Sequence, residues 1–124
     1  ISAQDFLNSG LLVRENGSGS RLALEVHCQE QRLSMHTKMQ LGSNDAIKHA
    51  VIAGLGVAVL PKLGILPELQ LGTLKIVEVP GFPLRRSWCV AHPKAKHPTP
   101  AMRAFIDYVQ QNIRRFEQMF AQQL

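Results

Sequence analysis

The sequence predicts an α/β fold, in which a small parallel sheet is covered by helices and followed by a long C-terminal helix. Three observations support this prediction. Segments with strand-like and helix-like patterns alternate, residues 41–61 have the pattern of a helix followed by a buried strand, and an amphipathic pattern of about five turns closes the sequence. Strands that alternate with helices usually pair in parallel, so we expect at least three parallel strands.

The segment at residues 41–61 organises the rest of the chain. Ser43 and Asn44 are favourable N-cap residues, and Asp45 places a negative charge on the first turn. The apolar residues that follow recur at helical spacing: Ala46, Ile47, Ala50, Val51 and Ile52. Gly54 is placed to end the helix, and Val57–Leu60 contains no polar residue. We therefore predict a helix with a free N-terminus, followed by a strand covered on both faces.

The segments before this unit alternate in the same way. In order, they are a helical turn over Ser2–Leu7, a strand at Leu11–Glu15, a turn-rich loop at Asn16–Ser20, a helix at Arg21–Gln31 and a half-buried strand at Thr37–Leu41. In the helix, Leu22, Val26 and Leu33 lie near one face, with Leu24 and Cys28 beside it.

The segments after it predict a short helix, two more strands and a linker. Pro67 begins the short helix, Leu74–Val79 and Arg85–His92 are the strands, and Trp88 and Val90, with Cys89 as a further candidate, pack from the second strand. Pro93–Pro100 is the linker, and Thr99 and Pro100 open the final helix as N-cap and first residue. Its apolar residues are Met102, Phe105, Ile106, Val109, Ile113, Phe116, Met119 and Phe120.

Composition restricts the class of protein. With 45% hydrophobic and 19% charged residues, a chain of 124 residues is expected to be one globular domain. It has neither a membrane-spanning apolar run nor a secretion signal, which predicts a cytoplasmic protein without membrane contact. The first residue is Ile1 rather than Met, which suggests a processed or cut product. The net charge of +5 is scattered and 6% of residues are aromatic, a pattern typical of a solvated surface.

The sequence offers no catalytic or metal-binding constellation. The two cysteines and five histidines lack ligand spacing, so we expect reduced cysteines, no metal and no cofactor. Gly17–Ser20 lacks the Lys of a P-loop and is either a plain turn or an anion contact. Ser43 and Asn44 have the same two readings, helix cap and ligand contact. Arg14 could pair with an acidic ligand, but a structural salt bridge is favoured. These residues argue against an enzyme.

Three blocks resemble the effector-binding domain of LysR-type transcriptional regulators. They are Val13–Arg21, Leu41–Lys48 and Ala53–Pro61, and their order and spacing match the family's. Glu68–Leu74 resembles the next segment, and Phe82–Trp88 is most similar to the branch that controls carbon-dioxide-fixation operons (CbbR-like). The resemblance covers residues 1–112.

This resemblance implies a periplasmic-binding-protein-like fold of two subdomains with the effector between them. Residues 1–92 would be subdomain two, and residues 93–124 would be a linker and a helix that packs on subdomain one. Subdomain one and the winged helix-turn-helix would be missing, so promoter DNA would be bound only through an N-terminal domain absent here. The implied effectors are phosphorylated metabolites or nucleotides, such as ribulose bisphosphate, phosphoenolpyruvate or NADPH.

The resemblance also implies site and interface residues. Effector contacts would come from Ser43 and Asn44 and from Val57, Ala58 and Val59, with the loop at Asn16, Gly17 and Ser18 nearby. The helix at Ser20–Leu33 and the strand at Thr37–Leu41 would form the surface of a homodimer. The sequence thus predicts a fragment that senses a small anionic metabolite. The alternatives are a solute-binding α/β domain without DNA binding, and, more remotely, an enzyme that uses Gly17–Ser20 as a phosphate loop.

Overall fold

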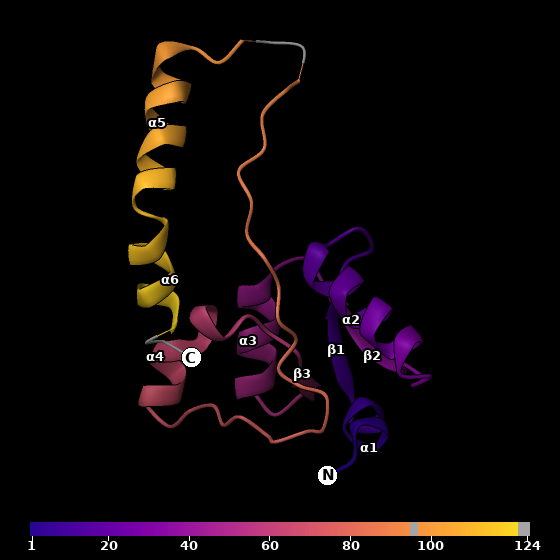
Figure 1. The fold of residues 1–124 in the computed structure, drawn as a ribbon. Coiled ribbons are helices and arrows are strands. Elements are labelled where there is room, and N and C mark those ends of the chain that lie inside the picture. The colour runs from indigo at the N-terminus through magenta and orange to yellow at the C-terminus, as the bar shows by residue number, and fades with distance from the viewer. Residues whose placement is uncertain (95–96, 122–124) are drawn as a thin grey trace. The chain divides into compact units, whose positions relative to one another are not determined.

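The computed structural model describes residues 1–94 and 97–121 and divides into two units, Ile1–Arg85 and Arg86–Leu124 (Figure 1). The first unit contains α1 (Ala3–Asn8), β1 (Leu11–Arg14), α2 (Gly19–Glu30), β2 (Thr37–Leu41), α3 (Asn44–Ile52), β3 (Val57–Ala58), the 3-10 helix η1 (Lys62–Ile65) and α4 (Leu66–Gln70). The second contains α5 (Pro100–Gln111) and α6 (Ile113–Ala121). None of the helices in the described residues has the length and apolar character needed to cross a bilayer.

The first unit is built on a three-stranded parallel sheet in the order β2-β1-β3. Leu11 and Leu12 of β1 pair with Val57 and Ala58 of β3, and Arg14 at the end of β1 lies opposite Leu41 at the end of β2. Because all three strands are parallel, their carboxyl ends meet at one edge of the sheet. The predicted α/β fold with at least three parallel strands is confirmed.

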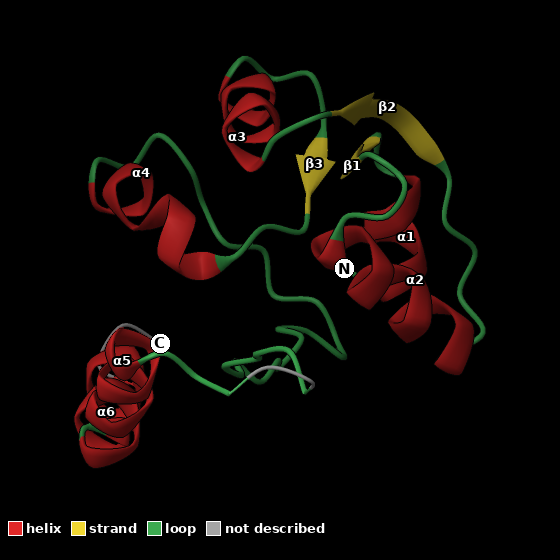
Figure 2. Ribbon diagram, turned by 90° about the horizontal axis from the view of Figure 1, so that it is seen from above, coloured by secondary structure: helices red, strands yellow, loops and turns green. Residues whose placement is uncertain are grey.

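Helices cover both faces of this sheet: α1 and α2 lie on one face and α3 on the other (Figure 2). Alternation along β1 sends Leu11 and Val13 into the core beneath α1 and α2, which also contains Phe6, Leu7, Leu24, Cys28 and Val79. Leu12, between them, is only 1% exposed and points to the α3 side, where Ile47 is also 1% exposed. The apolar burial on both faces explains why β1 contains three successive buried residues.

The ends of α3 follow from local sequence, as predicted. The Ser43 hydroxyl accepts a hydrogen bond from the Ala46 backbone N–H at 3.0 Å, which makes Ser43 the N-cap. At the other end Gly54 adopts a φ of 76°, and the Leu55 N–H donates to the Ala50 carbonyl at 3.0 Å. This is a Schellman motif, which requires a left-handed residue after the helix and therefore favours glycine.

The end of α2 has the same motif with an arginine in the left-handed position. Leu33 N–H donates to the Cys28 carbonyl at 2.8 Å, and Arg32 has a φ of 54°. A non-glycine residue pays a steric cost there, so we expect Arg32→Gly to raise the free energy of unfolding by about 0.5–1 kcal/mol. Chemical denaturation measures this. Arg32→Ala, which keeps the Cβ atom, should bring no such gain, and an equal gain from both variants would contradict the backbone explanation.

Three predicted strands differ from the structure. The strand expected at Val57–Leu60 is present only over Val57–Ala58 and is half-buried, because β3 lies at the edge of the sheet. Leu74–Val79 and Arg85–His92 form no strand, and Trp88 is 88% exposed rather than packed. A strand is stable only where a neighbour pairs with its backbone, and within the described residues neither segment joins the three-stranded sheet.

The burial of α2 and β2 also differs from the prediction. Leu24 and Cys28 are the buried residues of α2, whereas Leu22 and Val26 are 58% and 44% exposed. The strand β2 is largely exposed rather than half-buried. The reason is that β2 is an edge strand, with Leu41 as its best-covered residue.

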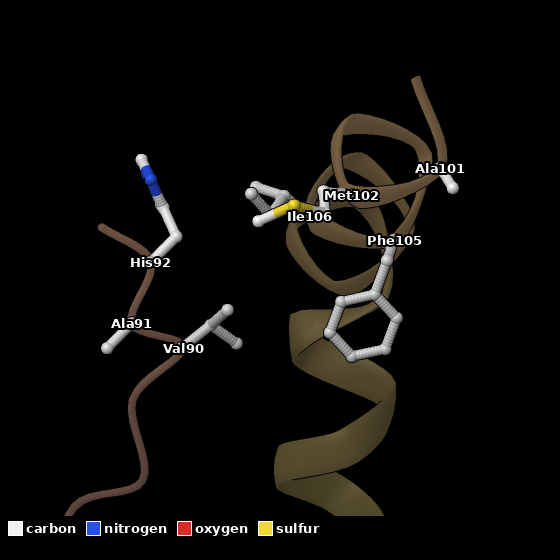
Figure 3. Close-up of a pocket in the computed structure, with 7 residues that line it drawn as sticks. All are labelled: Val90, Ala91, His92, Ala101, Met102, Phe105 and Ile106. Atoms are coloured by element: carbon white, nitrogen blue, oxygen red, sulfur yellow. The ribbon is translucent and has the colours of Figure 1, made fainter. Parts of the chain in front are cut away.

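The second unit carries the predicted amphipathic helix, divided into α5 and α6 at Asn112. Thr99 caps α5 by accepting a hydrogen bond from the Met102 N–H at 3.2 Å, as predicted. Asn112 leaves helical geometry and its side-chain amide donates to the Tyr108 carbonyl at 2.8 Å. Within this unit an apolar hollow of about 340 Å³ is lined by Val90, Ala91, His92, Ala101, Met102, Phe105 and Ile106 (Figure 3). Phe105, a member of the predicted apolar stripe, is 57% exposed.

Candidate functional site

An open hollow of about 370 Å³ lies in the first unit, at the N-terminus of α3. It is lined by residues from three segments: Ser43, Asn44, Asp45, Leu60, Pro61, Gly64 and Ile65. The first three belong to the start of α3, the next two follow β3, and the last two belong to η1. In parallel α/β sheets, ligands bind at the carboxyl ends of the strands, which is where this hollow lies.

The end of β1 brings a positive charge to the same edge. Arg14 is the last residue of β1, and its Nη1 donates to the Oδ1 of Asn44 at 3.2 Å. This contact follows from the register, because Arg14 lies opposite Leu41 and only Gly42 and Ser43 separate Leu41 from α3. The guanidinium is therefore next to the cap of α3.

Arg14 is held by a double hydrogen bond to Glu15. Its Nε and Nη2 donate to the two carboxylate oxygens at 2.7 and 2.8 Å, so the structural salt bridge predicted for Arg14 is present, with Glu15 as its partner. The side-chain hydrogen bond from Arg14 is the largest cause that lowers the pKa of Glu15 to about 2. Glu15 consequently stays ionised at physiological pH, and one guanidinium nitrogen of Arg14 remains directed at Asn44.

Arg21 supports Arg14 from α2. Its Nη1 donates to the Arg14 carbonyl at 3.1 Å and to Gln40 Oε1 at 2.7 Å, while its Nε pairs with Glu25 at 2.7 Å. These contacts tie the end of β1 to α2 and β2. The backbone from which the Arg14 side chain projects is therefore fixed on two sides.

The start of α3 supplies backbone donors to the hollow. The Ser43 hydroxyl satisfies the Ala46 N–H, whereas the N–H groups of Asn44 and Asp45 have no acceptor within the helix because of their position in the first turn. Such N–H groups and the helix dipole favour an anion. Leu60, Pro61 and Ile65 give the opposite wall an apolar surface. The arrangement suits a small anion with a short carbon skeleton.

An ion pair connects the two sides of the hollow. Lys48 Nζ lies 2.9 Å from Glu68 Oε1 and 3.1 Å from Asp45 Oδ1. The hydrogen bond with Glu68 is the largest cause that raises the pKa of Lys48, and the same bond lowers the pKa of Glu68. Glu68 Oε2 is buried and accepts no hydrogen bond from the described residues.

The structure groups some predicted site residues and separates others. Ser43 and Asn44 line the hollow. Val57 and Ala58 pair with Leu11 and Leu12 of β1, before the carboxyl ends of the strands, and Val59 packs against the core. The residues that follow them, Leu60 and Pro61, line the hollow in their place. The loop residues Asn16, Gly17 and Ser18 follow β1 and form a turn in which the Ser18 N–H donates to the Glu15 carbonyl at 3.2 Å. A ligand role for each of these residues remains a prediction.

Sequence reasoning missed the wall formed by Leu60, Pro61, Gly64 and Ile65, and the Lys48–Glu68 pair. A usable signal was present, because the segment after β3 must leave the sheet at the same edge as Ser43 and Asn44. The pairing of Lys48 with a residue twenty positions away left no comparable signal. Among residues 1–94 and 97–121, no group of three His, Cys, Asp or Glu side chains is placed to hold a metal.

Comparison with known proteins gives a consistent result. The model of the LysR substrate binding domain matches residues 1–114. The HTH-type transcriptional activator CmpR of Synechocystis sp. is 38% identical over 109 residues, which are 88% of this chain and 36% of that protein. The RuBisCO operon transcriptional regulator of Acidithiobacillus ferrooxidans is 42% identical over 98 residues, which are 79% of this chain and 32% of that protein. The chain thus spans about a third of the length of these relatives.

A solved structure has the same fold. The regulatory domain of CcmR from Synechocystis PCC6803, in complex with 2-PG, has a TM-score of 0.79 and 31% sequence identity. The match covers 88% of this chain and 52% of that one. Sequence and fold agree, and the family match extends over nearly the whole length: the chain belongs to the LysR substrate-binding domain family.

Proposed function

We propose that this chain is the ligand-sensing part of a LysR-type transcriptional regulator and that its effector is a small phosphorylated metabolite. The observation that carries the proposal is the placement of Arg14 beside Asn44 at the N-terminus of α3, on the edge of an open hollow. The relatives are named as transcriptional regulators, and the CcmR regulatory domain was solved with 2-PG. We infer that the anionic group binds between the guanidinium and the first turn of α3.

Each group in the hollow has a definable role in this proposal. The backbone N–H groups of Asn44 and Asp45 donate to the anion, and the hydroxyl of Ser43 and the amide of Asn44 fix its orientation. The family resemblance implies a second set of contacts from Val57, Ala58 and Val59 and from Asn16, Gly17 and Ser18, which lie outside the lining of this hollow. Binding requires no bond to be made or broken, so the proposed role includes no catalysis.

The effect on transcription would arise from a shift between conformations. A ligand that binds one arrangement of the effector domain more tightly raises the population of that arrangement, and linkage then changes affinity for DNA. Contact with DNA would come from a segment outside this chain. The regulator would act in the cytoplasm. Sequencing the reading frame upstream of Ile1 tests this part, since a winged helix-turn-helix is expected there.

We also propose that α2 and β2 contact a second protomer. The support is their uncovered apolar surface: Leu22 and Val26 of α2 and Met39 of β2 are 58%, 44% and 37% exposed. β2 also lies at the edge of the sheet, where its outer backbone groups can pair with another chain.

Calorimetric titration of the full-length protein with 2-phosphoglycolate (2-PG) tests the effector site. We expect Ser43→Ala combined with Asn44→Ala to weaken binding by about tenfold or more, because several charge-assisted hydrogen bonds are lost. Ser43 is also a helix cap, so a matched control is needed. Ser2→Ala removes the equivalent cap of α1, whose hydroxyl accepts from the Asp5 N–H at 3.1 Å, and it should leave affinity unchanged. Equal affinity of the double variant and the wild type would remove these residues from the site.

A further inference from the structure

The part of the hollow's wall that η1 forms, together with α4 directly after it (the η1–α4 wall), has little apolar anchorage. Neither element contains a buried residue, in contrast to α3, where Ile47 is 1% exposed. Leu63 in η1 is 37% exposed, and Leu71 just after α4 is 77% exposed. Elements with few buried contacts open locally at low free-energy cost. The position of this wall therefore depends on other interactions.

The Lys48–Glu68 ion pair is such an interaction. Lys48 lies one turn beyond Asn44 on α3, and Glu68 lies on α4, so the pair joins the helix that begins at the hollow to the η1–α4 wall opposite it. Both side chains are shielded, with 14% and 17% of their surface exposed, unlike Asp45 at 80%. A shielded pair of this kind is less screened by salt than an exposed one and fixes geometry more than it adds stability.

We propose that Lys48 and Glu68 are positioning residues that set the width of the hollow and thereby the affinity for its anionic ligand. This inference rests on the function proposed above. Neither side chain lines the hollow, so the pair acts through Asn44 and Asp45 on one side and Gly64 and Ile65 on the other. Loss of the pair would let the η1–α4 wall move away, and the ligand would lose its contacts with that wall.

The variant Glu68→Gln separates this role from direct electrostatics. Removing a negative charge near the hollow would strengthen anion binding if charge alone mattered. If the pair positions the wall, Glu68→Gln weakens binding of 2-phosphoglycolate instead, by about fivefold to tenfold, as does Lys48→Met. The double variant Lys48→Met/Glu68→Gln should then be no weaker than either single variant, since all three lack the same ion pair. Lys48→Arg keeps the charge and should retain affinity within about twofold.

Hydrogen exchange gives a second readout and a control. Amides of residues 62–71 should exchange faster in Glu68→Gln than in the wild type, with those of α3 unchanged. Asp5→Asn removes the carboxylate that accepts a hydrogen bond from the Ser2 hydroxyl at 2.7 Å in α1, and it should change neither affinity nor exchange at 62–71. If the wild type binds 2-phosphoglycolate and Glu68→Gln binds it as tightly or more tightly, the positioning role is overturned and the proposed function stays intact. Absence of wild-type binding to phosphorylated probes would overturn the proposed function and this inference together.

Discussion

Gly56→Ala should cause a large loss of stability. A Cβ atom on residue 56 would lie 2.1 Å from the carbonyl oxygen of Gly10 and 3.1 Å from side-chain carbons of Leu12. Neither neighbour can retreat easily. The Gly10 carbonyl accepts the Val57 N–H at 3.1 Å where β3 begins to pair with β1, and Leu12 is 1% exposed in the core. We expect the free energy of unfolding to fall by about 3 kcal/mol or more, a large share of the stability of a typical domain.

A matched glycine on the same unit provides the control for Gly56→Ala. Gly42 has an ordinary φ, and a Cβ atom added there would meet no atom within 4 Å. We therefore expect Gly42→Ala to change the unfolding free energy by less than about 0.5 kcal/mol. Urea denaturation followed by circular dichroism measures both variants. Similar stability of the two would show that β3 can separate from β1 without cost, contrary to the packing described above.

The features that sequence predicted well are those set by residues close together in the chain. Ser43 and Thr99 are predictable as caps because each hydroxyl directly precedes an apolar periodic segment. Its hydrogen-bond donor is a backbone N–H within the first turn of the same helix. Gly54 was identified as the end of α3 for the same reason. The parallel sheet followed from the alternation of strands and helices, which restricts the possible connections.

The features that sequence predicted poorly depend on distant residues. Leu74–Val79 and Arg85–His92 have strand-like patterns, but pattern alone supplies no partner, and neither segment pairs within the described residues. The candidate site divides in the same way. Ser43 and Asn44 are visible as a local helix start, whereas the wall at Gly64 and Ile65 reaches them only through the fold. A sequence therefore reveals one side of such a site more readily than the whole.

Ile47→Ala should have the second large effect, and it connects the core to the site. Ile47 is the buried residue of α3, and with Leu12 it fills the α3 side of the sheet. Truncation removes three carbon atoms from a close-packed region, so we expect a loss of about 2–4 kcal/mol in the free energy of unfolding. Ile52 lies on the same helix but is 41% exposed, and Ile52→Ala should cost less than about 1 kcal/mol by the same measurement.

The two isoleucine variants also test how α3 holds the effector site. Because Ile47 is one turn from Asn44, movement of α3 into the cavity left by Ile47→Ala would shift the first turn away from Arg14, whose Nη1 lies 3.2 Å from Asn44 Oδ1. Affinity for 2-phosphoglycolate should then fall together with stability in Ile47→Ala and stay near the wild-type value in Ile52→Ala. If both variants lost the same stability, burial of Ile47 would not be what anchors α3. If Ile47→Ala lost stability alone, the first turn of α3 would be held in place by its contacts with Arg14 and Lys48 rather than by the core beneath it.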